Sequence, residues 1–157
     1  MCAEEVAIVS GAYSYRRDPA VPAFPDDRPI VIFDGNCVLC SAFAQFILRA
    51  DRRRRFRLMA AQTPLGAALY EHYGLFADDY RTNILLEDGR VWLKSDGSIR
   101  IFEGLGFPWS MAALGKALPR GLRDRLYDTI ARNRLRWFGR RETCFVPDPQ
   151  DADRFLG

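Results

Sequence analysis

The sequence contains no apolar run of the roughly 20 residues that a membrane-spanning helix needs. Neither sign of charge dominates, because 23 Lys and Arg against 20 Asp and Glu leave a formal net charge of +3. This balance demands neither a nucleic acid nor an acidic partner. Residues 1–9 carry Glu4 and Glu5 and lack the basic start of a signal peptide. We therefore expect a cytoplasmic protein that acts without a membrane or a nucleic acid.

Cysteine is scarce, with four among 157 residues. In a reducing cytoplasm, four cysteines do not form a disulfide framework. Two of them, Cys37 and Cys40, have the spacing Cys-x-x-Cys. In such a compartment this spacing is typical of a redox, catalytic or metal-binding site. Histidine is scarcer still, since His72 is the only one, and its place near the end of a predicted helix predicts an exposed side chain.

The residues that are present predict one folded domain. Hydrophobic residues make up 48% of the chain, as in globular proteins, and the length fits a single domain with its own core. The beginning of the chain differs, because prolines recur between residues 19 and 29 in a stretch with little periodicity. We predict an extended or mobile arm over residues 1–27 and a single domain over residues 28–157.

Hydrophobic periodicity predicts the secondary structure. We expect four strands, at residues 29–33, 56–61, 83–86 and 90–94. We expect helices at residues 37–50, 64–73, 108–118 and 120–138, and helical structure again after Ser95. A helix crossover joins parallel strands, and Glu87-Asp88-Gly89 suits a hairpin between antiparallel ones. This order predicts an α/β, thioredoxin-like fold, in which helices flank a central four-stranded mixed sheet and extra helices follow at the C-terminus.

The Cys-x-x-Cys lies where the first predicted strand passes into a helix. A thiol at a helix start meets the positive end of the helix dipole, which favours its thiolate. Cys37 is thus predicted to be the attacking thiolate, and Cys40, one turn further on, the resolving thiol. Asn36 is predicted to cap the helix. Asp34 has two open roles, since it can accept the proton of Cys40 or can cap the helix and anchor the turn.

The segment Asp34-Gly35-Asn36-Cys37-Val38-Leu39-Cys40 resembles the Asp-Gly-x-Cys-x-x-Cys signature of the DCC family. Further similar segments lie at residues 105–109, 127–134 and 144–147 and at Gly139. The resemblance implies a thioredoxin-like fold and thiol-disulfide oxidoreductase activity. One departure from better-known thioredoxins is that no proline occurs between Pro64 and Pro108. Thr82 or Asn83 therefore takes the place that a cis-proline holds before the third strand of those proteins.

Together these features predict a thiol-disulfide oxidoreductase that needs no cofactor. We expect its substrate to be a disulfide-containing protein or a small thiol, and an external reductant to reset the cysteine pair. One alternative is a metal-binding module that uses Cys37 and Cys40, with Cys144 and His72 as further ligands. Another is a thioredoxin-like protein that binds partners without turnover. Cys144 is either a third thiol of the site, a regulatory partner or an ordinary loop cysteine.

Arginines gather at two further places in the sequence. Residues 52–55 are four consecutive arginines after the first helix, which form either a solvated surface or a patch for RNA or an anionic surface. The last predicted helix combines several arginines with an apolar stripe of Leu122, Leu126, Ile130 and Trp137. Within it, Arg134 is predicted to be a partly buried structural residue.

Overall fold

The computed structural model describes residues 12–75, 83–140, 142 and 146–156. Its central element is a sheet of four strands, which are β1 (Ile30–Phe33), β2 (Arg57–Ala60), β3 (Ile84–Glu87) and β4 (Arg90–Leu93). The strand order is β2-β1-β3-β4, with β1 parallel to β2 and the other two pairs antiparallel. The predicted mixed sheet of a thioredoxin-like α/β fold is confirmed.

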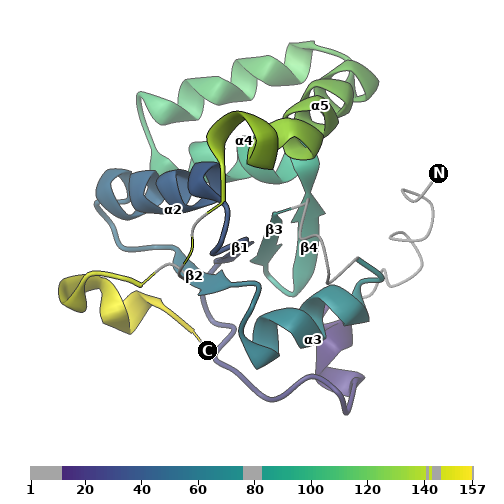
Figure 1. Cartoon of the computed structure of the whole chain (residues 1–157), viewed down its shortest axis with the longest axis vertical. Coiled ribbons are helices and arrows are strands. Elements are labelled where there is room, and N and C mark those ends of the chain that lie inside the picture. The colour runs from purple at the N-terminus through teal and green to yellow at the C-terminus, as the bar shows by residue number, and fades with distance from the viewer. Residues whose placement is uncertain (1–11, 76–82, 141, 143–145, 157) are drawn as a thin grey trace.

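Helices lie on both sides of this sheet, as Figure 1 shows. The α-helices are α2 (Val38–Ala50), α3 (Pro64–His72), α4 (Lys94–Leu105) and α5 (Arg120–Phe138). The 3-10 helices are η1 (Ser14–Arg17), η2 (Trp109–Ala117) and η3 (Pro149–Arg154). In the described part of the chain, no helix is both long and apolar enough to cross a membrane.

The central strand β1 is apolar throughout because both of its faces are buried. Successive side chains of a strand point to opposite faces of the sheet. Val31 and Phe33 pack in a core with residues of α2 and α4. Ile30 and Ile32 pack in a second core with residues of η1 and α3. Both cores therefore hold β1 in place, and with it the turn that follows Phe33.

Two features of the helices differ from the sequence prediction, and a third, the direction in which α5 faces, is decided by the structure. Helix α2 begins at Val38 rather than at Cys37, because Cys37 has extended backbone angles and caps the helix. Residues 109–117 form a 3-10 helix and not an α-helix. The apolar stripe of α5 lies on the solvent side, where its four side chains are about half exposed, because the opposite side of α5 packs on α2 and α4.

The predicted N-terminal arm lies partly outside the described residues, which begin at residue 12. In its described part, Tyr15 and Val21 are buried in the core beside α3. Tyr15 also donates a hydrogen bond of 2.7 Å to Asp26. The division of the chain at residue 27 stays a prediction, although these two side chains belong to the core of the domain.

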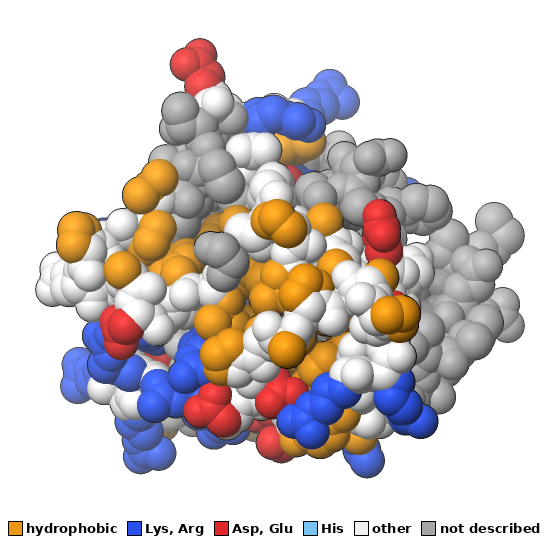
Figure 2. Space-filling model, turned by 90° about the horizontal axis from the view of Figure 1, so that it is seen from below, with side chains coloured by type: hydrophobic (Ala, Val, Ile, Leu, Met, Phe, Trp, Pro, Cys, Tyr) orange, Lys and Arg blue, Asp and Glu red, His pale blue; other side chains and the backbone are white. Residues whose placement is uncertain are grey.

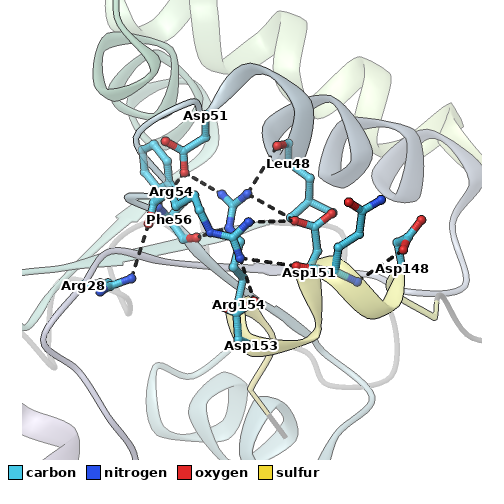
Figure 3. A network of polar contacts seen from close by, with 10 residues as sticks. Arg28, Leu48, Asp51, Arg54, Phe56, Asp148, Asp151, Asp153 and Arg154 are labelled. Atoms are coloured by element: carbon cyan, nitrogen blue, oxygen red, sulfur yellow. Dashed lines mark hydrogen bonds and ion pairs between the residues drawn. The ribbon is translucent and has the colours of Figure 1, made fainter.

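A buried arginine holds the C-terminal segment against α2 and β2 (Figure 3). Arg154 of η3 donates to Asp51 Oδ2 at 2.5 Å and to the carbonyl oxygens of Leu48 and Phe56 at 3.3 and 3.2 Å. The same carboxylate oxygen of Asp51 accepts a hydrogen bond from the backbone N–H of Phe56 at 2.8 Å. Both charged side chains are 2% exposed. The pair thus joins the end of α2 to the last turn of the chain.

Candidate active site

The two cysteines lie at the start of α2, at the edge of the sheet where β1 ends. Cys37 is the N-cap of α2, and its Sγ accepts a hydrogen bond from the backbone N–H of Cys40 at 3.3 Å. The prediction that Asn36 caps this helix was therefore wrong. Asn36 belongs to the preceding turn, where its own N–H donates to Asp34 Oδ1 at 2.9 Å. The Sγ atom of Cys37, which is predicted to react, thus accepts a hydrogen bond from a backbone amide at the N-terminus of the helix.

The two thiols are strongly unequal in acidity. A hydrogen bond from the Cys40 side chain, aided by the Cys40 amide and the charge of Arg134, lowers the pKa of Cys37 to about 6 against the opposing effect of burial. Donation to Cys37 and burial raise the pKa of Cys40 far above its ordinary value. Both are free thiols in this structure. At neutral pH the arrangement favours a thiolate at Cys37 and a neutral thiol at Cys40.

Asp34 anchors the turn that carries Cys37. Its Oδ1 accepts hydrogen bonds from the Asn36 N–H and, at 2.6 Å, from Gln62 Nε2. Its Oδ2 accepts one from Arg134 Nη2 at 3.0 Å, and its backbone oxygen accepts the N–H of Cys37 at 3.2 Å. The anchoring role that the sequence left open is thus the one seen in these contacts. Acceptance of the Cys40 proton by Asp34 stays a prediction.

Two residues that complete this turn come from other elements. Gln62 follows β2, and its Oε1 accepts the N–H of Gly35 at 2.9 Å while its amide donates to Asp34. The sequence analysis did not identify Gln62. The position of Gln62 directly after β2 was a usable signal, because the ends of parallel strands meet at one edge of a sheet. Arg134 comes from α5 and is 3% exposed. Its predicted burial is confirmed, and the carboxylate it meets is that of Asp34.

The chain that follows α5 covers the cysteine pair. The N–H of Val38 donates to the carbonyl oxygen of Gly139 at 3.3 Å, and Cys37 and Arg140 form an isolated antiparallel bridge. Gly139 has a φ of 87°, which glycine adopts without strain, and it ends α5 so that the chain can pass over Cys37. Cys37 is 0% exposed and Cys40 is 5% exposed, and both also pack in the core between β1, α2 and α4.

Asn83 is the residue before β3, and Thr82 lies outside the described residues. That one of them takes the place of the thioredoxin cis-proline stays a prediction. The backbone N–H of Asn83 donates to the hydroxyl of Tyr127 at 3.0 Å. Burial raises the pKa of Tyr127 to about 12, so this phenol is neutral at physiological pH. Helix α5 thus also contacts the residue before β3, the strand that pairs with β1.

His72 does not have the exposed side chain that the sequence predicted. Its Nδ1 lies 2.7 Å from Asp18 Oδ2 and its Nε2 lies 2.9 Å from Ser14 Oγ, and its side chain is 9% exposed. The reason is that η1 packs against the end of α3. Over the described residues, no three side chains of His, Cys, Asp or Glu are grouped so that they could hold a metal ion. Cys144, the other predicted ligand, lies outside those residues, as does Cys2.

Two arginines of the run at residues 52–55 are engaged in ion pairs. Arg54 contacts Asp153 at 2.6 Å, and Arg55 contacts Glu87 at 2.6 Å. Figure 2 shows the molecule from the side below the sheet of Figure 1, with apolar side chains near the centre and with both signs of charge interspersed along the lower edge. A mixed distribution of this kind creates no extended field of one sign.

Comparison with known proteins shows which family the chain resembles. A family model described as "DCC1-like thiol-disulfide oxidoreductase" matches residues 31–140, which include both cysteines, Asp34 and Arg134. The uncharacterized protein YuxK of Bacillus subtilis (strain 168) is 36% identical over 127 residues, which cover 81% of this chain and 93% of YuxK. The chloroplastic DCC family protein At1g52590 of Arabidopsis thaliana is 35% identical over 120 residues, 76% of this chain and 70% of that protein. No solved structure matches.

Proposed function

Because the chain belongs to the DCC1-like thiol-disulfide oxidoreductase family, we propose that it is a thiol-disulfide oxidoreductase with Cys37 as nucleophile and Cys40 as resolving thiol. The observation that supports this assignment is the difference in acidity between the thiols of Cys37 and Cys40. Cys37, with a pKa of about 6, is the stronger acid, and the pKa of Cys40 is raised. A nucleophile must be ionised at neutral pH, whereas a resolving thiol has to stay protonated until the mixed disulfide forms.

The proposed reaction transfers two electrons to the substrate. The thiolate of Cys37 attacks one sulfur of the substrate disulfide, forms a mixed disulfide and releases the other sulfur as a thiolate, which takes a proton from water. Cys40 then loses its proton and attacks Cys37. The second substrate sulfur leaves, and the Cys37–Cys40 disulfide remains. An external dithiol reduces this disulfide and is itself oxidised. Protein disulfides and small disulfides are both substrates of the right chemistry.

In this proposal Asp34 acts mainly by holding the turn. Its carboxylate accepts hydrogen bonds from Gln62 and Arg134, which hold it in place. The proton of Cys40 ends on the leaving substrate thiolate, because an ordinary thiol has a pKa of about 8.5 and an aspartic acid one of about 3.9. Asp34 serves as a transient relay at most.

Access to Cys37 requires that the segment at Gly139 and Arg140 moves. Cys37 is 0% exposed and pairs with Arg140, so in this proposal the covering segment at Gly139 and Arg140 separates from the start of α2 to admit a substrate sulfur. Among the described residues, the hydrogen bond from the Val38 N–H to Gly139 O is one main-chain contact that holds it. Opening by breakage of this contact leaves helix α2 intact.

The substitution Val38→Pro tests the covering segment. Val38 is the first residue of α2, where proline is tolerated, and the extended angles of Cys37 suit a residue before proline. Proline removes the donor to Gly139, at a cost to the closed state of about 1 kcal/mol. We expect Cys37 in this variant to react with iodoacetamide at pH 8 about five times faster than in Val38→Ala, which keeps the N–H. Equal rates, followed by mass spectrometry, would show that the contact does not limit access.

The substitution Cys40→Ser tests the assigned roles. In a chain that also carries Cys2→Ser and Cys144→Ser, we expect incubation with a protein disulfide to accumulate a mixed disulfide through Cys37, because no resolving thiol remains. The matched chain with Cys40 intact should release the substrate and show no such adduct. Non-reducing electrophoresis and peptide mapping measure both. A Cys40→Ser chain that binds the substrate without a covalent adduct would favour partner binding without turnover.

A further inference from the structure

Arg134 brings a positive charge from a distant part of the chain to the cysteine turn. It lies on α5, 100 residues after Asp34, and its Nη2 donates to Asp34 Oδ2 at 3.0 Å. Its Nη1 donates at 2.8 Å to the carbonyl oxygen of Ala131 in its own helix, which fixes the direction of the side chain. Arginine is rarely buried without a charged partner, so its burial here indicates a defined task.

This cation is close enough to act on both thiols. Its charge is one of the effects that lower the pKa of Cys37. Burial opposes the charge of Arg134, but the hydrogen bond to Asp34 and the charges of the two cysteines and Asp34 raise its pKa. Among the described residues, Tyr127 of α5 and Tyr70 of α3 also interact with this cluster. Burial raises the pKa of both phenols, so both are neutral. Besides the hydrogen bonds from Cys40 and burial, the charges that shift the pKa of Cys37 are therefore those of Arg134 and Asp34.

We propose that Arg134 is a positioning residue for the reaction at Cys37: it holds Asp34, and through it the turn, in place, and its charge stabilises the Cys37 thiolate. The redox site is then complete only when α5 is docked, although the cysteines themselves lie on β1 and α2 of the thioredoxin-like core. Figure 1 shows the end of α5 beside the start of α2, where Val38 and Gly139 share a hydrogen bond. The importance of Arg134 for exchange rests on the proposed function, but its effect on Cys37 can be measured without any substrate.

The two halves of the ion pair have opposite effects on Cys37, which separates electrostatics from mere structural support. The charge of Arg134 lowers the pKa of Cys37 and that of Asp34 raises it. Arg134→Met should therefore raise this pKa and Asp34→Asn should lower it. If the ion pair served stability alone, the two variants would not shift the pKa of Cys37 in opposite directions, because removal of either partner breaks the same contact.

The experiment measures thiolate formation in the full-length, reduced chain by absorbance at 240 nm against pH, together with alkylation of Cys37. A change of about one pH unit in the pKa, the lower end for a neighbouring charge, reduces the thiolate fraction of Arg134→Met at pH 6 about five-fold. For Asp34→Asn we expect an increase of up to about five-fold at pH 5. Above pH 9 all variants should agree, because Cys37 is ionised in each.

Three further variants complete the test. Arg132→Met removes an exposed arginine of the same helix, whose Nε donates to the carbonyl oxygen of Asp128, and it should match the wild type. Arg134→Lys should retain most of the thiolate because it keeps the charge. The double variant Asp34→Asn with Arg134→Met leaves no unpaired buried charge, so it should fold, and its opposite effects should largely cancel.

Two results would overturn the inference. One is Arg134→Met with the same titration as Arg132→Met, and the other is Arg134→Met and Asp34→Asn shifting the titration in the same direction. Failure of the proposed function looks different. In that case the opposite shifts appear, but the wild type does not reduce disulfides, and the electrostatic effect of Arg134 on Cys37 stands without a role in exchange.

Discussion

Replacement of Cys37 by serine should reduce the rate of disulfide reduction by at least about 10³-fold. A serine hydroxyl is not ionised near neutral pH and cannot form a mixed disulfide, so only the uncatalysed exchange with the reductant remains. The rate is measured as the reduction of a model protein disulfide by dithiothreitol, with and without the protein. In the wild type this rate should rise with pH through about 6, because the attacking form of Cys37 is its thiolate.

The control for this experiment is Cys2→Ser, which removes a cysteine outside the Cys-x-x-Cys pair. Its rate should equal that of the wild type. If Cys37→Ser also retains the wild-type rate, Cys37 takes no part in the reaction. A rate that falls equally in both variants would point to a general effect of losing a thiol and would likewise contradict the assignment.

Replacement of Asp51 by alanine should have the largest effect on stability. It leaves the guanidinium of Arg154, which is 2% exposed, without its short contact to a buried carboxylate. The carbonyl oxygens of Leu48 and Phe56 and the more distant carboxylate of Asp151, at 3.8 Å, remain. Breaking a buried ion pair in this way costs about 3–5 kcal/mol of the free energy of unfolding. For a chain of this size the melting temperature should fall by on the order of 10 °C. Thermal and urea unfolding, followed by circular dichroism, measure both quantities.

Asp153→Ala is the matched control for this prediction. Asp153 also pairs with an arginine of the same region, Arg54, at 2.6 Å, but its side chain is 71% exposed. Water and salt weaken such a surface pair, so the melting temperature should stay close to that of the wild type. Equal effects of Asp51→Ala and Asp153→Ala would contradict the importance that we give to the buried pair (Figure 3).

Much of the fold could be predicted because its signals are local. The apolar run of β1, the hairpin at Glu87-Asp88-Gly89 and Pro64 at the start of α3 each lie within a few residues. They indicated the strands, the mixed pairing and the place of the Cys-x-x-Cys. The choice of helix cap was wrong because Asn36 and Cys37 are adjacent, and the backbone angles of the turn decide which side chain reaches the free amides.

The sequence by itself thus determined the reactive groups of the site, which are two thiols one helical turn apart at the start of a helix. The tertiary structure alone decided what surrounds that pair. Gln62 comes from the segment after β2, and Arg134 and Gly139 come from α5 and its end, and no periodicity links either segment to Cys37. The physical reason is the distance along the sequence over which each interaction acts. Helix dipoles and turns act on residues a few positions away. A buried charge and a covering backbone segment act through space on residues that the fold brings close, however distant they are in the sequence.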